Sequence, residues 1–126
     1  MRVSLQLNPD LKPATSEEIK AIRDLLELSP VNSGGLVFDA NEKAIMRMER
    51  ALANFVSLPT LLADGRLYWK MADNSITAIT KAQLEDALRD IAIRAAKLHV
   101  HAAQLQLQAN TTGLAKGQIK PETWPV

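Results

Sequence analysis

One stretch constrains the fold more than any other: residues 66–109, where a predicted β-hairpin leads directly into a long helix. Two short runs rich in apolar residues, Leu67–Ala72 and Ser75–Thr80, are separated by Asp73 and Asn74. Because Asp and Asn tolerate a left-handed backbone, this pair is typical of a tight turn between two antiparallel strands. The sequence therefore predicts a hairpin over 67–80.

A two-residue turn would fix the pairing of the two strands, with Met71 opposite Ile76 and Trp69 opposite Ala78. Side chains alternate between the two faces of a strand, so one face should carry the larger apolar residues. This face would hold Leu67, Trp69, Met71, Ile76 and Ala78. An isolated hairpin is only marginally stable in water, so we expect a helix to cover that face.

The helix that follows is predicted to run over 81–109. Thr80 and Gln83 form a capping box in front of it, and neither Gly nor Pro interrupts the chain before Gly113. Its apolar residues recur at alternating spacings of four and three, as in a coiled coil. They are Leu84, Leu88, Ile91, Ala95, Leu98, Ala102 and Leu105. This row could pack on other helices of the same chain or on another chain, and our interface hypothesis uses Leu98, Ala102 and Leu105.

Two further helices are predicted from capping boxes. Thr15 with Glu18 indicates a helix over 16–28, and Asp39 with Glu42 indicates one over 40–57. The loop between them contains a Gly-Gly pair, but no Lys-Ser or Lys-Thr follows, which argues against a phosphate-binding loop. The predicted fold class is α+β and mostly α, with three helices, the 67–80 hairpin and an N-terminal strand over 2–7 as an optional addition.

The predicted organisation has three parts. Residues 1–14 form an N-terminal strand and linker, residues 15–110 a helical and hairpin domain, and residues 111–126 an extended tail. Ile119 and Trp124 are the large apolar residues of this tail, which should dock either on its own domain or on a neighbour. We include both in the interface hypothesis, because Trp in particular is enriched at binding hot spots.

Composition limits the function classes. The 126 residues carry a net charge of +1, so a bulk electrostatic attraction to nucleic acid is not expected, although Lys43, Arg47 and Arg50 could form a small basic row. Cysteine is absent, and neither a signal peptide nor an apolar run of membrane-spanning length is recognisable. We therefore expect synthesis in the cytoplasm and no contact with a membrane.

The sequence offers no recognisable catalytic constellation. The two histidines, His99 and His101, would point to different sides of one helix and could not bind a metal together. Protonation of these histidines could tune an oligomer, although a plain structural role is the simpler interpretation. We expect no catalytic residue, no metal ligand and no cofactor, and hence no enzyme.

The hairpin carries the pattern W-x-x-A-D-N, formed by Trp69, Ala72, Asp73 and Asn74, and Thr80 then precedes the long helix. Together with Gly35–Ala40, this pattern resembles a domain of unknown function found in tail, tail-fibre and tail-fibre-assembly proteins of tailed bacteriophages. The resemblance spans residues 17–108 and gives Trp69, Asp73 and Asn74 a structural role in the hairpin.

The resemblance implies a non-catalytic structural protein of a phage tail, baseplate or fibre-attachment region. Such a protein would bind other tail or fibre proteins, form a homo-oligomer, and reside in the virion tail after synthesis in the host cytoplasm. One alternative is an assembly chaperone that stays in the host cytoplasm. A small regulatory protein that binds nucleic acid is the less favoured alternative.

Overall fold

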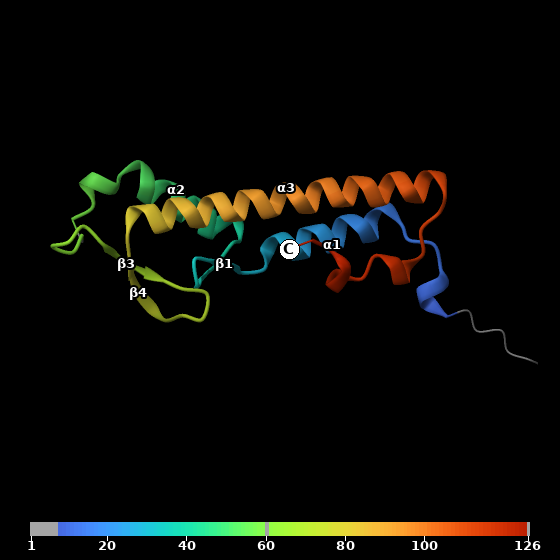
Figure 1. Ribbon diagram of the computed structural model, residues 1–126, viewed down its shortest axis with the longest axis horizontal. Coiled ribbons are helices and arrows are strands. Elements are labelled where there is room, and N and C mark those ends of the chain that lie inside the picture. Colours follow the sequence, from blue (N-terminus) through green and yellow to red (C-terminus); the bar gives the residue numbers. More distant parts are fainter. Residues whose placement is uncertain (1–7, 60, 126) are drawn as a thin grey trace, which may run out of the picture. The chain divides into compact units, whose positions relative to one another are not determined.

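A computed structural model describes residues 8–59 and 61–125 (Figure 1). Helices and short antiparallel hairpins make up the structure, which confirms the α+β, mostly α, fold class. The chain divides into two compact units, Glu27–Ala95 and a second one formed by Met1–Leu26 with Ala96–Val126. The long helix α3, Lys81–Thr111, contributes residues to both units, and each unit is described by itself.

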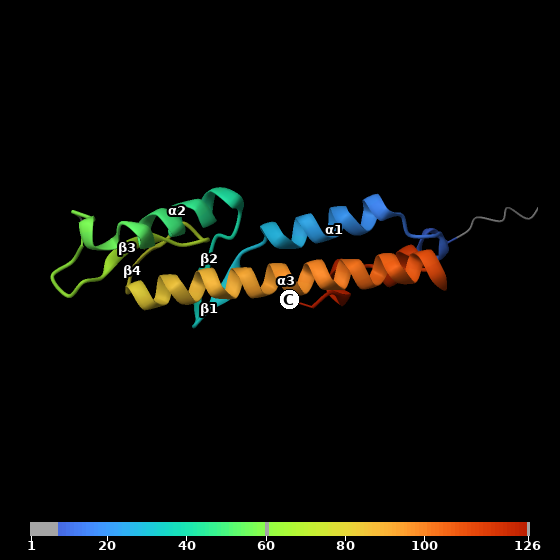
Figure 2. The ribbon, with the colours of Figure 1, turned by 90° about the horizontal axis from the view of Figure 1, so that it is seen from above.

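Unit Glu27–Ala95 contains two hairpins, one complete helix and the first part of α3. Its elements are β1 (Val31–Ser33), β2 (Leu36–Phe38), α2 (Glu42–Ala53), β3 (Leu67–Lys70) and β4 (Ile76–Ile79), with a 3-10 turn at Phe55–Ser57. Figures 1 and 2 show the hairpins and α2 around the first part of α3. The buried core of this unit joins Phe38, Met48, Ile79 and Leu84, which are almost completely shielded from solvent.

Helix α2 differs from the predicted range of 40–57 at both ends. Its N-cap is Asn41, whose side-chain oxygen accepts a hydrogen bond from the backbone N–H of Ala44 at 2.8 Å. The predicted cap, Asp39, lies two residues before the observed cap. The α-helix ends at Ala53, beyond which the chain tightens into the 3-10 turn.

The hairpin formed by β1 and β2 was not predicted. Its turn is the pair Gly34 and Gly35, which adopt φ angles of 59° and 86°. Two consecutive positive φ angles match the right-handed twist of the flanking strands, and glycine reaches them without a steric penalty. The backbone N–H of Ala72 donates to the carbonyl of Val37 at 3.0 Å and thereby links the two hairpins.

The hairpin formed by β3 and β4 is confirmed in position, but its predicted register was wrong by one residue. Trp69 pairs with Thr77, and Leu67 pairs with Ile79. The reason is a loop of three residues, in which Asn74 takes a left-handed φ of 69°. Since a shift of one residue reverses the faces of a strand, Ile76 is exposed and Ile79 is buried.

The second unit pairs α1 (Ser16–Leu28) with the C-terminal part of α3, and both views show the two helices side by side (Figures 1 and 2). Both capping boxes predicted for these helices are confirmed. At α1, the N–H of Glu18 donates to the hydroxyl of Thr15, and the N–H of Thr15 donates back to the carboxylate of Glu18. At α3, Thr80 and Gln83 exchange the same pair of hydrogen bonds.

The segment after α3 is not the extended tail that was predicted. It forms two 3-10 turns, at Lys116–Gln118 and Pro121–Thr123, and folds onto its own unit. The N–H of Lys116 donates to the carbonyl of Lys12 at 2.8 Å, next to an isolated bridge between Pro13 and Ala115. The predicted N-terminal strand over 2–7 lies outside the described residues.

Candidate functional site

The residues of the interface hypothesis are buried within their own chain. One core cluster joins them to Ile19 of α1 and to Leu114. The five are Leu98, Ala102, Leu105, Ile119 and Trp124, each less than 9% exposed. The interface hypothesis for these side chains is therefore replaced by a core role, because α1 and the C-terminal segment cover the far end of the predicted seam.

Trp124 is held in this core by two contacts. Its indole N–H donates to the carbonyl of Ile119 at 3.0 Å, which satisfies the polar atom of a buried side chain. The ring of His101 meets the indole edge to face, with centroids 4.8 Å apart and the planes at 65°. Of the two docking modes left open for the tail, the structure shows docking on its own unit.

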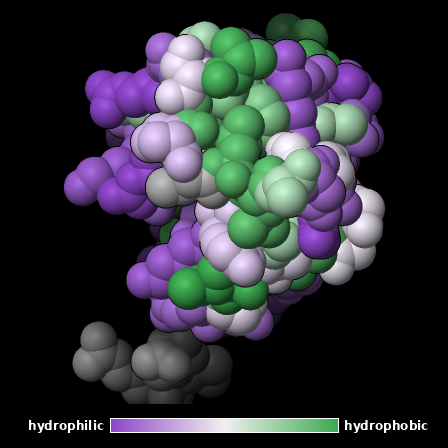
Figure 3. Space-filling view, turned by 90° about the vertical axis from the view of Figure 1, so that its left-hand side faces the viewer, coloured by the Kyte–Doolittle hydropathy of each residue, from purple (hydrophilic) through white to green (hydrophobic). Residues whose placement is uncertain are grey.

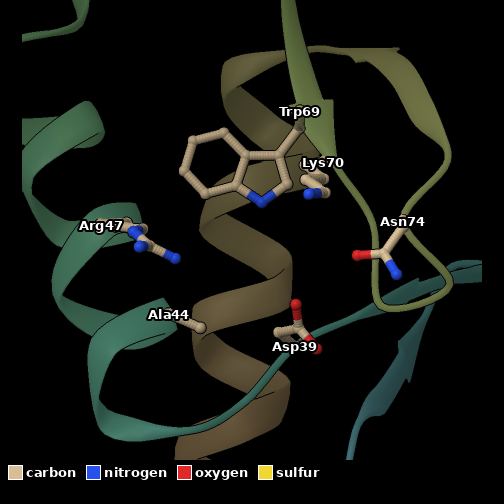
Figure 4. Close-up of a pocket in the computed structure, with 6 residues that line it drawn as sticks. All are labelled: Asp39, Ala44, Arg47, Trp69, Lys70 and Asn74. Atoms are coloured by element: carbon tan, nitrogen blue, oxygen red, sulfur yellow. The ribbon is translucent and has the colours of Figure 1, made fainter.

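The most distinctive recess of unit Glu27–Ala95 lies between α2 and the β3–β4 hairpin. It is an open depression of about 500 Å³, and Figure 4 shows its lining. The residues are Asp39, Ala44, Arg47, Trp69, Lys70 and Asn74. Ala44 and the half-buried Trp69 form its apolar part, whereas the other four side chains are exposed and polar. We refer to this recess as the Trp69 depression.

Four separate elements bring these side chains together. Trp69 and Lys70 end strand β3, and Asn74 supplies the left-handed residue of the adjoining turn. Asp39 follows β2 directly, and Arg47 lies on α2 three residues after Ala44. In Figure 4 the nitrogen-bearing edge of the indole faces the side on which Ala44 and Asp39 lie.

The polar groups of the Trp69 depression are not used inside the fold. With respect to residues 8–59 and 61–125, the side chains of Asp39, Arg47 and Lys70 form no ion pair or hydrogen bond, and the indole N–H of Trp69 has no acceptor. A fold that leaves a hydrogen-bond donor, two cations and one carboxylate around one recess presents groups that a ligand can engage.

The turn that carries Asn74 is fixed by Asp73. The Asp73 carboxylate accepts hydrogen bonds from the hydroxyl of Ser75 at 2.6 Å and from its backbone N–H at 2.9 Å. These two bonds lower the pKa of the Asp73 carboxyl below its usual value. Asp73 therefore holds the geometry of the turn rather than lining the depression.

Arg94 has a structural role that the sequence did not reveal. Arg94 is only 9% exposed, which is unusual for an arginine. Its guanidinium donates to the carbonyls of Glu27, Ser29 and Pro30 and to the hydroxyl of Ser29, at 2.5 to 3.0 Å. Burial lowers the pKa of Arg94, whereas the charge of Glu27 acts in the opposite direction. Arg94 thus supplies donors to the carbonyls at the end of α1.

A separate apolar surface lies in the loop that follows α2. Val56 is 91% exposed there, and Figure 3 shows hydrophobic side chains among hydrophilic ones on that end of the molecule. A single exposed apolar side chain is ordinary on a protein surface. Because Val56 is a single exposed apolar side chain, whereas unpaired polar groups surround Trp69, the Trp69 depression is the better candidate site.

Within residues 8–59 and 61–125, no three or more His, Asp or Glu side chains lie close enough to hold a metal ion. The helices described there lack the combination of length and apolar character that crossing a bilayer requires.

Fold and depression together define a small α+β domain with an open, mainly polar recess at the junction of a hairpin and a helix. The chain belongs to the family described as "Domain of unknown function (DUF4376)", whose model matches residues 10–122. Comparisons with curated proteins and with solved structures found no match.

Proposed function

We propose that this chain is a non-catalytic component of a bacteriophage tail, baseplate or fibre-attachment region and that it works by binding other tail or fibre proteins. The observation that carries the proposal is the Trp69 depression, where unpaired polar groups surround a half-buried tryptophan. Tryptophan and arginine are the residue types that most often dominate the binding energy of protein interfaces.

The resemblance of the W-x-x-A-D-N hairpin to a phage tail-associated domain supports the same proposal. Two residues of that pattern, Trp69 and Asn74, line the depression, and a third, Asp73, fixes the turn between the strands. The pattern that carries the resemblance therefore builds the candidate binding surface.

The first test is mass spectrometry of purified particles of a tailed phage that encodes this chain. We expect the chain in stoichiometric amount relative to other tail proteins. Its absence from the particles would reject the structural role. Presence only in a complex with a tail or fibre protein before assembly would instead favour an assembly chaperone.

The second test locates the surface. A photo-crosslinking amino acid replaces Asn74 at the depression, and a matched variant carries it in place of Leu107, which is 64% exposed on α3. During particle assembly, we expect position 74 to capture a tail or fibre protein and position 107 to capture none. Equal capture at both positions would argue against the Trp69 depression as the binding surface.

A further inference from the structure

The Trp69 depression carries positive charge that the fold leaves uncompensated. In the part of the chain that the structure describes, ion pairs are formed by Arg23, Arg66, Arg89, Lys116 and Lys120. Arg47 and Lys70 are absent from this group, although both are exposed and both line the same recess. Asp39 is the single carboxylate among the lining residues, so the lining has an excess of one positive charge.

Helix α2 extends this positive surface beyond the depression. Lys43 precedes Arg47 by four residues and Arg50 follows it by three, so the three cations lie on one helix face. Lys43 and Arg50 are exposed and have no ion-pair partner among residues 8–59 and 61–125. The acidic residues of α2, Glu42 and Glu49, lie more than about 130° around the helix from Arg47, as its 3.6-residue turn requires.

The tryptophan gives the depression more than charge. Because the ring of Trp69 is half-buried, one part packs on the core and another remains open to a ligand. Its N–H needs an acceptor when a partner displaces water, since an unsatisfied buried donor costs about 1–3 kcal/mol. A carboxylate or carbonyl oxygen would satisfy it.

We propose that the Trp69 depression binds an acidic segment of the partner protein. Carboxylates of that segment pair with Arg47 and Lys70, and one of its oxygens accepts the indole N–H of Trp69. Asp39 accepts a backbone N–H of the same segment. The assignment rests on the proposed function, since it names the chemistry of the partner at that surface.

A protein partner fits these groups better than a nucleic acid does. Asp39 would oppose a phosphate placed beside Arg47, and the whole chain has a net charge of only +1. Binding to single-stranded nucleic acid uses several aromatic side chains along a basic groove, whereas Trp69 is the lone aromatic residue lining this recess.

The test follows the indole N–H signals of the full-length chain, labelled with ¹⁵N at tryptophan, by NMR. The chain has two tryptophans, and Trp124 is an internal control because its indole N–H is buried and bonded to Ile119. The probe is an acetylated and amidated hexaglutamate peptide, with hexalysine and a ten-nucleotide thymidine oligomer as comparison probes. We expect hexaglutamate to shift the Trp69 signal and to leave the Trp124 signal in place.

Substitutions then test the assignment of the cations. Arg47→Gln and Lys70→Gln should each weaken hexaglutamate binding about fivefold to tenfold, the scale of one lost charge-assisted contact. The matched control is Arg89→Gln, which removes an exposed cation of α3 and should leave the affinity unchanged. Binding should weaken as salt is raised, since exposed charges are screened.

Three results would overturn the inference: no shift at Trp69, an equal loss of affinity with Arg89→Gln, or binding of hexalysine as tight as that of hexaglutamate. Tighter binding of the thymidine oligomer would reassign the depression to nucleic acid. These results are distinct from failure of the proposed function, which depends on the presence of the chain in phage particles. Failure of peptide binding while the chain is found in particles overturns only the acidic-segment assignment.

Discussion

Replacing Arg94 with methionine should destabilise the protein by about 3 kcal/mol. The substitution removes four hydrogen bonds donated by a charged group, each of which contributes about 1.5–3 kcal/mol before compensation. Two effects reduce that sum. Methionine relieves the desolvation of the guanidinium, and water can reach part of the carbonyls that are released. Removing one partner of a buried charged network still costs about 3–5 kcal/mol in other proteins, and we take the lower end.

The assay is urea denaturation followed by far-UV circular dichroism. A loss of about 3 kcal/mol is a large part of the 5–15 kcal/mol typical of a domain, but it leaves the variant folded. Arg94→Lys should recover less than half of the loss, because an ammonium group cannot reach several carbonyls as a planar guanidinium does.

The matched control is Arg89→Met on the same helix. Arg89 is 64% exposed and forms an exposed ion pair with Asp86 at 3.0 Å, so its removal should cost less than about 0.5 kcal/mol. The proposed role of Arg94 at the end of α1 is refuted if the unfolding free energy of Arg94→Met lies within about 1 kcal/mol of the wild-type value, or if it equals that of Arg89→Met.

Three further predictions concern the unit formed by the two ends of the chain. Leu98→Ala should lower the unfolding free energy by about 3 kcal/mol in thermal unfolding, whereas Leu107→Ala, at an exposed position, should change it by less than about 0.5 kcal/mol. Equal effects of the two substitutions would contradict the core role of Leu98. Gly117→Ala should cost about 1–3 kcal/mol because a Cβ there would come within 2.9 Å of the Cβ of Asp10, and an unchanged melting temperature would show that this contact relaxes freely. The hydrogen bond from Thr15, chiefly, and then that from Lys116, lower the pKa of Glu18 below its usual 4.5. The ionised Glu18 carboxylate should stabilise the fold fully at pH values above its usual pKa, and this stabilisation should disappear as the pH falls through the lowered pKa. In denaturant titrations, the difference in unfolding free energy between wild type and Glu18→Gln should therefore shrink on acidification.

The parts of the fold that the sequence predicted correctly depend on neighbouring residues. Thr15 with Glu18 and Thr80 with Gln83 form helix caps from residues three positions apart, and both boxes are present in the structure. The first of these boxes sets the start of the 16–28 helix, and Pro30 sets its end, so the predicted bounds agree with the observed ones.

The errors arose where one extra residue or a distant partner decides the geometry. The hairpin loop contains a third residue, Ala72, besides Asp73 and Asn74, and this shifts every pair in the β3–β4 ladder. The pair Gly34 and Gly35, followed by the apolar run Leu36–Phe38, is a hairpin signal that could have revealed β1 and β2. It was read as a flexible loop instead.

The Trp69 depression was not predictable from local pattern. Asp39, Arg47 and Lys70 are up to 31 positions apart in sequence and are brought together only by the packing of α2 against the hairpin. Arg47 was noted as part of a basic row, but no sequence rule places that row beside a tryptophan. Similarly, the burial of Arg94 was not predictable from local pattern, because its carbonyl acceptors lie more than 60 positions earlier in the sequence.

The bond from Arg94 to Glu27 has a kinetic consequence. One compact unit is built from two stretches of chain separated by the 69 residues from Glu27 to Ala95, so its two halves must find each other across a long intervening segment. Closing a flexible loop of that length costs about 4 kcal/mol of chain entropy at room temperature. If Glu27–Ala95 folds first, Arg94 draws both ends of that segment within the reach of one side chain. Most of the loop-closure entropy is then lost before α1 packs against the C-terminal part of α3. We therefore expect folding to proceed from the interior of the sequence towards its termini.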